Sequence, residues 1–311
     1  MTKNTRNFVL GVLTILFCLN ILAWVAVFDL NRPQFLEVIF FDVGQGDAIF
    51  IETPQRHQIL IDGGPTSVIL EKLGAEMPFW DKSIDLIILT HPERDHMVGL
   101  IEVLKKYKIE QILWTGVLRD TSEFKEWEKL IKEEKAEIKI AQAGQKVIVS
   151  RTEGPSRRPG GRRAGCSLDI LYPFESLEGK ESKNSNNTSI ISRLNFNEDS
   201  FLFTGDAYKS VEKELIREYS CSNSCKFASL DSDVLKVGHH GSKTSTSEEF
   251  LEKVLPEIAV IQVGQNKYGH PHPEVLEKLE KFDIKVLRTD KEGDIKIISD
   301  GIRYKYEVSN F

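Results

Sequence analysis

The densest group of metal-binding residue types is the segment His91-Pro-Glu93-Arg-Asp95-His96, which directly follows an apolar run. Transition-metal sites need imidazole and carboxylate ligands that converge from a rigid strand end, and this segment supplies two of each. The alternative is a polar loop in which Asp95 caps the helix expected to begin near Met97. The density of ligands and the apolar strand before them favour a metal site.

A pair of adjacent histidines, His239 and His240, also follows an apolar strand. The segment from Asp85 to His91 and the segment starting at Asp233 both run from an aspartate through apolar residues to a histidine. This internal similarity suggests two strands that deliver a histidine to one shared site. It predicts His239 as the metal ligand, with His240 as the competing choice.

Three aspartates adjoin glycine at predicted strand ends. Asp206 follows Phe-Thr-Gly and could bridge two metal ions, or it could cap the helix expected over 207–218. Asp42 and Asp62 could orient ligand histidines, whose second ring nitrogen commonly binds a carboxylate. The alternative for these two residues is an ordinary turn before glycine.

The elements that must position these residues are short apolar runs that alternate with amphipathic helical segments. We predict strands over 35–41, 48–53, 58–61, 85–90, 146–150, 168–171, 189–196, 201–204, 233–237, 258–263, 285–287, 294–298 and 303–308. We predict helices over 97–107, 122–136, 207–218, 248–254 and 273–282. Strand groups interleaved with helices through both halves indicate a layered α/β domain.

The N-terminal segment predicts a membrane anchor, because residues 9–28 carry no charge. A helix of about twenty residues reaches roughly 30 Å, the thickness of a bilayer core. Basic residues precede the stretch, so the positive-inside rule predicts a cytoplasmic N-terminus. The alternatives are a buried core helix and a cleaved signal peptide, for which Trp24 is too large at the −3 position. We expect a single-pass protein of the cell membrane, with an anchor over 1–32 and an extracytoplasmic domain over 34–311.

Composition narrows the classes of protein. With 41% hydrophobic and 28% charged residues, the 311-residue chain can bury a core. A net charge of −6 gives no general basic field, so any binding to nucleic acid must be local.

The segment 152–165 is either a solvated insertion or a local substrate-binding patch for DNA phosphates. The patch consists of Arg157, Arg158, Arg162 and Arg163. Cys221 and Cys225 either form a small disulfide or remain thiols.

Six sequence tags carry a resemblance to a known family. DVGQGDA, LIDGG, THPxxDH, FTGDA, LKVGHHGS and NKYGHPHP occur in this order between Leu36 and Ile298. The ordered set closely resembles the metallo-β-lactamase-fold domain of the ComEC family of competence proteins. The resemblance implies an αββα sandwich with a metal site at one edge of its two sheets, and an extracytoplasmic nuclease that acts on DNA during uptake. It implies as metal-site positions His91, Glu93, Asp95, His96, Asp206 and His239.

The sequence departs from the wider superfamily at two places. Glu93 stands at the middle position of the superfamily motif HxHxDH, and no histidine occurs between His96 and Asp206. Asn187 lies where the superfamily usually has that further histidine, as an alternative ligand. The first metal would then be held by His91, Glu93 and Asp206, and oxygen ligands favour manganese or magnesium over zinc. We expect one or two divalent ions, manganese or zinc, with magnesium as a third candidate.

The implied reaction is metal-assisted hydrolysis of a phosphodiester, in which a metal lowers the pKa of a water molecule. Asp95 would bind the metal and orient the nucleophile. His270 would protonate the leaving group or donate to the transition-state oxygen, unless it is structural. We assign Lys236 no catalytic role. The alternatives are hydrolysis of a small phosphodiester, ester or amide, and a non-catalytic metal-binding domain. No second apolar run of that length follows residue 31, so we expect that DNA transport either needs a separate channel protein or does not occur.

Overall fold

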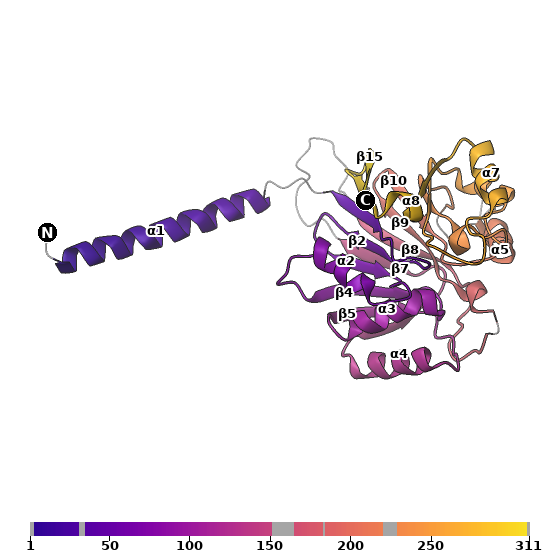
Figure 1. Ribbon diagram of the computed structural model, residues 1–311, viewed down its shortest axis with the longest axis horizontal. Coiled ribbons are helices and arrows are strands. Elements are labelled where there is room, and N and C mark those ends of the chain that lie inside the picture. The colour runs from indigo at the N-terminus through magenta and orange to yellow at the C-terminus, as the bar shows by residue number, and fades with distance from the viewer. Residues whose placement is uncertain (1–2, 31–34, 151–164, 183, 220–228, 310–311) are drawn as a thin grey trace. The chain divides into compact units, whose positions relative to one another are not determined.

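The structure is a computed structural model that describes residues 3–30, 35–150, 165–182, 184–219 and 229–309. The chain forms two compact units, residues 1–34 and residues 35–311. The first contains the helix α1 (Lys3–Leu30), and the second is an α/β domain with two sheets (Figure 1). The predicted arginine patch and the pair of Cys221 and Cys225 lie outside the described residues.

Helix α1 contains the predicted apolar stretch. Over Thr5–Trp24 its mean hydropathy is 2.1, and it is long and apolar enough to cross a membrane. A signal sequence has the same properties near an N-terminus. The prediction of an N-terminal helix able to span a bilayer is therefore confirmed, while its retention and its orientation stay predictions.

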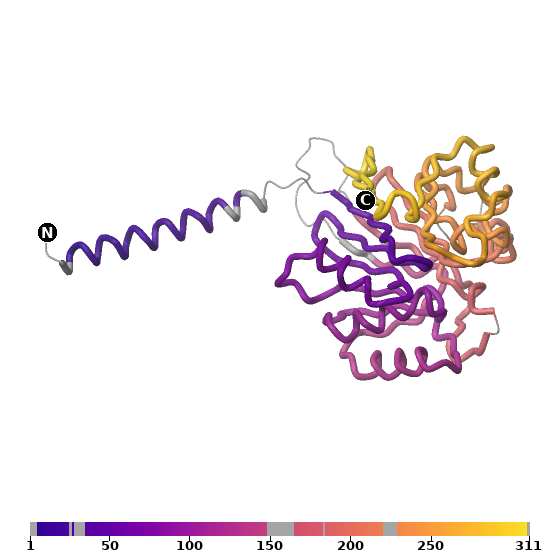
Figure 2. The backbone as a smooth tube through the Cα atoms, viewed as in Figure 1, coloured from indigo at the N-terminus to yellow at the C-terminus, as the bar shows by residue number. Residues whose placement is uncertain are grey.

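The first sheet has eight strands in the order β15-β14-β1-β2-β3-β4-β5-β6. The strands are β1 (Leu36–Phe40), β2 (Ile49–Glu52), β3 (Gln58–Ile61), β4 (Ser83–Leu89), β5 (Lys108–Trp114), β6 (Glu137–Ile140), β14 (Ile295–Ser299) and β15 (Tyr304–Val308). Strands β3 to β6 run parallel, whereas β14 pairs antiparallel with β1. In Figure 2 the yellow C-terminal strands accordingly lie beside the indigo β1.

The second sheet has seven strands in the order β13-β12-β11-β10-β9-β8-β7. They are β7 (Lys146–Ser150), β8 (Cys166–Tyr172), β9 (Ile191–Phe196), β10 (Asp199–Phe203), β11 (Val234–Lys236), β12 (Ile258–Ile261) and β13 (Lys285–Arg288). Strands β10 to β13 are parallel, so their carboxyl ends meet at one edge of the sheet.

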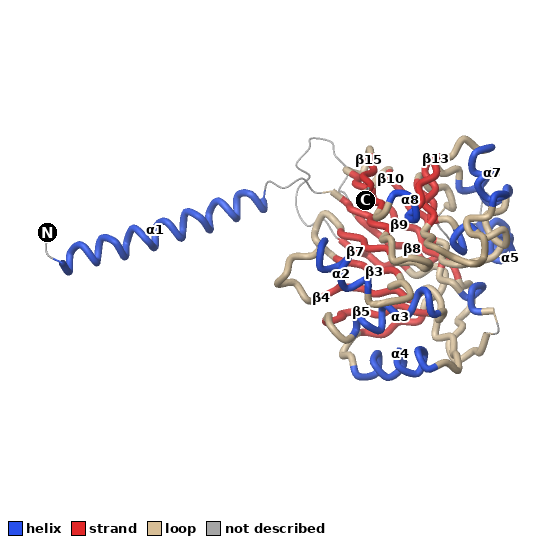
Figure 3. The backbone as a smooth tube through the Cα atoms, in the orientation of Figure 1, coloured by secondary structure: helices blue, strands red, loops and turns tan. Residues whose placement is uncertain are grey.

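Helices cover the outer faces of both sheets (Figure 3). The first sheet carries α2 (Val68–Glu76), α3 (Arg94–Leu104) and α4 (Ser122–Glu133), and the second carries α5 (Lys209–Tyr219), α6 (Glu248–Val254) and α7 (Pro273–Lys281). Short helices are η1 (Ser185–Thr188), η2 (Gly238–Gly241) and α8 (Thr289–Glu292). The alternation of strand side chains explains the layers: Ile88 packs between the sheets and its neighbour Ile87 packs under the helices.

The predicted αββα sandwich is confirmed. The sequence analysis did not name α2, β5 or β6, and it placed the start of the helix after His91 three residues too late. The early start matters for function, because Asp95 and His96 then lie in the first turn of α3. Glu93, not Asp95, is the N-cap residue of that helix, and its side chain makes no capping hydrogen bond.

Candidate metal centre

The first set of ligands depends on a close approach between α3 and the loop after β3. A Cβ atom on Gly99 would lie 1.7 Å from the carbonyl oxygen of Gly63, so the two backbones touch. The N–H of Gly63 donates to the carbonyl of His96 (2.8 Å), and the N–H of Gly99 donates to Gly64 (2.9 Å). These contacts hold the first turn of α3 directly beside Asp62, the residue that precedes this glycine pair.

Asp62 orients His96 in the way that the sequence analysis anticipated. The carboxylate is buried, and its Oδ2 lies 2.8 Å from Nδ1 of His96. Thr90 donates to the same carboxylate from its N–H (2.8 Å) and its hydroxyl (2.7 Å). An acceptor at Nδ1 places the proton there and leaves Nε2 of His96 free to act as a ligand.

The second set of ligands comes from η2, directly after β11. His239 (φ 50°) and His240 (φ 53°) both adopt the left-handed backbone conformation. His240 consequently points inward: its Nε2 lies 3.3 Å from Oδ2 of Asp95 and 3.4 Å from Oδ2 of Asp206. Its Nδ1 lies 2.9 Å from the carbonyl of Gln262, which fixes the ring. His239 lies at the rim, with its Nε2 3.8 Å from Asp206.

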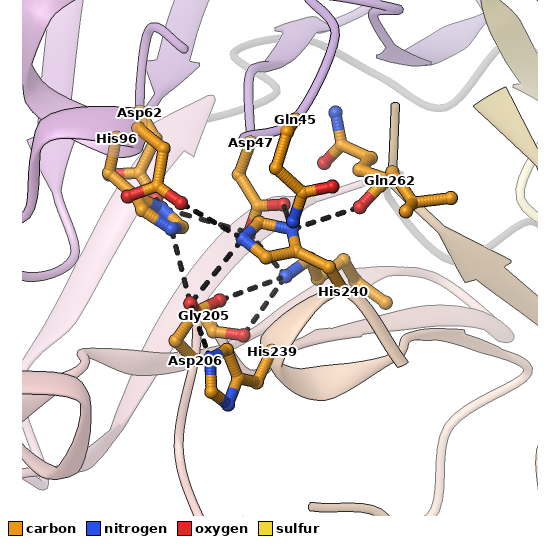
Figure 4. Close-up of polar contacts among 12 residues, drawn as sticks. Gln45, Asp47, Asp62, His96, Gly205, Asp206, His239, His240 and Gln262 are labelled. Atoms are coloured by element: carbon orange, nitrogen blue, oxygen red, sulfur yellow. Dashed lines mark hydrogen bonds and ion pairs between the residues drawn. The ribbon is translucent and has the colours of Figure 1, made fainter. Parts of the chain in front are cut away.

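Four side chains thus converge, each offering a ligand atom, and these atoms all lie within 4.8 Å of one another. The four are Asp95, His96, Asp206 and His240. Figure 4 shows Asp206 facing both His96 and His240. His96 follows a strand of the first sheet, whereas Asp206 and His240 follow strands of the second sheet. The competing choice of the sequence analysis, His240, therefore joins the cluster, whereas His239 lies beside it.

His91 and Glu93 differ in burial and in the residues that they contact. His91 is completely buried, and its ring centroid lies 4.2 Å from that of His96. The carboxylate of Glu93 receives a hydrogen bond from the hydroxyl of Ser185 and pairs with Arg119 (2.9 Å). Glu93 is thus held by an arginine and does not belong to the cluster of four ligands.

Buried polar atoms that make no hydrogen bond test whether a metal fits here. Nε2 of His91, His96 and His240 and Oδ1 of Asp206 are buried and make no hydrogen bond. Leaving such atoms unpaired costs about 1–3 kcal/mol each, so native structures rarely contain several together. Imidazole nitrogens and carboxylate oxygens that converge are the donor set of a divalent cation. The residues therefore fit a metal ion.

The carboxylates of the site raise the pKa of two of its histidines. Burial alone would lower the pKa of His240, but Asp206 and Asp47 outweigh it and raise that pKa to about 10. Burial opposes charge on His96 as well, yet Asp206 and Asp62 raise the pKa of His96 well above its usual value. The carboxylates around the two rings thus favour positive charge at this place, as they would favour a bound cation.

His91 and Asp206 shift in the opposite direction. Burial, assisted by repulsion from His96, lowers the pKa of His91 to about 3, so this ring is neutral. Burial favours protonation of Asp206, but His240 and His96 hold the pKa of this carboxyl well below its usual range. A neutral imidazole and an ionised carboxylate are the forms that bind metals.

The sequence analysis missed a buried ion pair, between Lys236 and Asp47. Lys236 is 1% exposed, forms a short ion pair with Asp47, and donates to the carbonyl of Gly205 at 2.9 Å. Its ammonium also lies 3.8 Å from Asp206. The strand pattern contained a signal, since Val234 faces the space between the sheets and Lys236, two residues later, must face the same way. Asp47 also lies 3.3 Å from His240.

Several predicted site residues lie around the cluster. Asp42 accepts the N–H of Gly44 (3.1 Å), a turn contact and not a contact with a histidine. Asn187 accepts the N–H of Tyr208 (3.3 Å), after Asp206, and so braces that loop. His270 packs edge-on against His239, with ring centroids 5.4 Å apart, and its Nδ1 is buried without a partner.

The remaining predicted substrate-binding residues cannot be placed, because they lie outside the described ranges. They are Arg157, Arg158, Arg162 and Arg163. Their role stays a prediction.

Comparison with known proteins identifies relatives of similar sequence. The chain is 33% identical over 294 residues to the ComE operon protein 3 of Bacillus subtilis (strain 168), and the match covers 88% of this chain. It is 28% identical to the competence protein ComA of Neisseria gonorrhoeae, over 83% of this chain. It is 27% identical to the recombination protein 2 of Haemophilus influenzae, over 91% of this chain. These matches confirm the predicted resemblance to competence proteins, although the chain spans only 34%, 32% and 31% of their respective lengths.

A solved structure and a family profile identify the fold. The metallo-beta-lactamase fold protein YhfI from Bacillus subtilis superimposes with a TM-score of 0.53 at 12% identity, over 86% of this chain and 100% of that chain. The profile of the Metallo-beta-lactamase superfamily matches residues 41–265. That range contains the whole cluster of Asp95, His96, Asp206 and His240. The chain therefore belongs to the metallo-beta-lactamase superfamily.

Proposed function

We propose that this chain is a metal-dependent phosphodiesterase that cleaves DNA outside the cytoplasm and is anchored in the membrane by α1. The observation that carries the proposal is the convergence of Asp95, His96, Asp206 and His240, with imidazole nitrogens that are buried and make no hydrogen bond. The competence-related relatives support DNA as the substrate, with the limit that this chain spans only a third of their length.

In this proposal the four clustered side chains hold one divalent ion, with His240 rather than His239 as the histidine from η2. His91, whose Nε2 is free in the same buried space, extends the set toward a second ion. The bound metal supplies Lewis-acid stabilisation of the negative charge on the phosphate oxygens. Manganese or zinc fits this mixed set of nitrogen and oxygen ligands, and magnesium is the third candidate.

The residues of the chain itself perform the positioning. Asp62 and Thr90 fix the ring of His96, while Gln262 fixes the ring of His240. Lys236 forms an ion pair with Asp47 and donates to the carbonyl of Gly205. It would therefore hold the backbone directly before Asp206 in place when substrate binds. Preorganised ligands of this kind lower the barrier because they need not rearrange during the reaction.

His270 would act as a neutral hydrogen-bond donor to the phosphate. Burial, with repulsion from His239 and His240, lowers the pKa of His270 to about 4. A neutral imidazole still carries one N–H, but it is seldom protonated near pH 7 and is a weak general acid there. Of the two roles predicted from sequence, donation to the transition-state oxygen is thus favoured.

The arginine patch and the topology complete the proposal. Arg157, Arg158, Arg162 and Arg163 would contact DNA phosphates without reading sequence. A separate channel protein would carry DNA across the membrane. Residues 34–311 would fold as a soluble hydrolase domain without the anchor at 1–32, and a reporter fused after Phe311 would be active outside the cytoplasm.

The test is a substrate panel run on the purified full chain with added manganese and, separately, with zinc. The panel contains single-stranded DNA, duplex DNA, bis-p-nitrophenyl phosphate and a β-lactam. We expect cleavage of DNA and of the chromogenic phosphodiester, and loss of both in Asp95→Ala. Cleavage of the β-lactam alone would replace the proposal by an amide hydrolase, and metal binding without any turnover would replace it by a metal-binding domain.

A further inference from the structure

A shallow, open cavity of about 460 Å³ lies between the loop after β1 and the loop after β12. Its lining residues are Gln45, Gln265, Asn266, Lys267 and Tyr268. Both loops lead directly into the metal centre, since Asp47 follows the first and His270 follows the second. The rings of Tyr268 and His270 are 5.8 Å apart, and His270 contacts His239 at the rim of the cluster. The cavity therefore lies near the rim of the cluster.

Backbone and side-chain contacts fix the shape of this cavity. A Cβ atom on Gly264 would lie 2.4 Å from the backbone of Gly44, so the two loops are in direct contact. Oδ1 of Asn266 accepts the N–H groups of Tyr268 and His270, both at 3.0 Å. Nδ2 of Asn266 donates to the carbonyls of Gly264 and His270, both at 2.9 Å. One amide side chain thus holds the loop that carries Tyr268.

The aromatic ring on this fixed loop is unusually open to solvent. Tyr268 is 64% exposed, although a ring of its size normally gains stability from burial. The ammonium of Lys267 lies 5.6 Å from the centroid of the Tyr268 ring. An exposed aromatic face, a neighbouring cation and polar amides together match the features of surfaces that bind unpaired nucleotides.

We propose that Tyr268 and Lys267 form a nucleotide-binding subsite for single-stranded DNA, in which Tyr268 stacks on one unpaired base and Lys267 contacts an adjacent phosphate. The inference rests on the proposed nuclease function and names the form of DNA that the metal centre receives. Stacking requires a free base face, which duplex DNA does not offer, and it tolerates all four bases because each has a π-face. Lysine binds phosphate as a point charge.

The test compares Tyr268→Ala and Tyr268→Phe in the full chain. The alanine variant should raise the KM for a single-stranded oligonucleotide about 5- to 150-fold, as expected when one stacked base loses its partner. The phenylalanine variant should retain the parent KM, because it keeps the ring. The kcat and KM for bis-p-nitrophenyl phosphate and the KM for blunt duplex DNA should not change. Lys267→Ala should raise the single-strand KM and flatten its dependence on salt.

Matched controls come from β15, away from the site. Tyr306 and Lys305 are exposed neighbours of the same residue types. Tyr306→Ala and Lys305→Ala should therefore leave every kinetic constant unchanged. An oligonucleotide series with a single abasic site gives an independent readout. One abasic position should reproduce the KM increase of Tyr268→Ala in the parent and add nothing in that variant, because ring and base then form one interaction.

The outcomes separate this inference from the proposed function. If the parent chain cleaves no DNA, the nuclease proposal fails before the subsite is tested, and the subsite inference falls with it. If the parent cleaves single-stranded DNA and Tyr268→Ala does so with the same KM, the subsite is wrong while the nuclease proposal stands. Equal losses on DNA and on bis-p-nitrophenyl phosphate would also overturn it, since they would show that Tyr268 supports His270 structurally.

Discussion

The two turns that supply histidines to the metal centre begin from similar sequences and fold differently. After β4 the chain enters the right-handed helix α3, and His96 in its first turn faces inward. After β11 the chain enters η2, where His239 and His240 have positive φ angles. The left-handed step places His240 inward and His239 at the rim. Similar residue patterns therefore deliver ligands from different positions, because the backbone conformation decides which side chain points inward.

The strand ends that lead into the two turns also carry different residues. In the first turn the hydroxyl of Thr90 donates to the buried carboxylate of Asp62. In the second turn a full positive charge, that of Lys236, occupies the strand end and pairs with Asp47. A hydrogen bond from an uncharged hydroxyl and a buried ion pair differ in what their removal costs, so this contrast can be tested by substitution.

The largest effect is expected from Lys236→Met. Removing one member of a buried ion pair leaves the other charge uncompensated and costs about 3–5 kcal/mol. Asp47 keeps contacts with His96 and His240, so a value near 3 kcal/mol is expected for the free energy of unfolding. Denaturant unfolding of the metal-free full chain measures it.

Thr90→Val is the matched variant in the first turn. It removes one hydroxyl from Asp62, which still receives the N–H of residue 90 and the contact with His96. The expected loss is about 1–2 kcal/mol. Equal losses in the two variants would show that the ion pair contributes no more than a hydrogen bond from an uncharged hydroxyl, and the contrast between the turns would disappear.

Metal affinity should separate the two histidines of η2. His240→Ala removes a ligand of the cluster, and we expect manganese binding to weaken more than 100-fold, beyond what loss of a supporting residue causes. His239→Ala removes a ring at the rim and should weaken binding less than about 10-fold. Isothermal titration of the purified full chain gives both constants, with circular dichroism as the control for folding. A larger loss in His239→Ala would favour His239, the ligand predicted from sequence.

Proton release on metal binding is a smaller effect that compares the turns directly. His240, with a pKa raised to about 10, and His96, with a pKa well above normal, are both protonated at pH 7 without metal. Each must lose its proton to bind a metal, so about two protons should leave per ion. His91 is already neutral and should release none.

The same protonation states determine how metal affinity changes with pH. Protons compete with the metal, so affinity should fall as pH falls, by about 100-fold from pH 7 to pH 6 for two protons. Titration in buffers with different ionisation enthalpies counts the protons. His240→Ala should release one fewer than the parent, and a count near zero in the parent would contradict the assigned protonation states.

The sequence predicted the layers of the fold and the loops of the site for physical reasons. Runs such as Ile87–Ile88 are apolar on both faces because helices cover one side and the other sheet covers the opposite side. Asp62 and Asp206 were recognisable because they adjoin glycine at strand ends, and the His91–His96 segment because it gathers four ligand residue types after an apolar run.

What the sequence could not supply was the backbone conformation and the register at the strand ends. The choice between His239 and His240 depends on φ angles that residue types other than glycine seldom adopt. Asp42 and Asp47 flank the turn Gly44–Gly46, and only the contacts of these residues reveal that Asp47 faces the cluster. The pairing of Glu93 with Arg119 joins segments whose distance in sequence gives no indication of contact.

The most direct test of the account is the position of a bound metal. Crystals of the full chain grown with manganese should give one strong anomalous peak bonded to Asp95, His96, Asp206 and Nε2 of His240. His239 should remain outside bonding distance of that peak. A manganese peak bonded to His239 instead of His240, or a peak held by Glu93 after release from Arg119, would contradict the assignment of the metal centre.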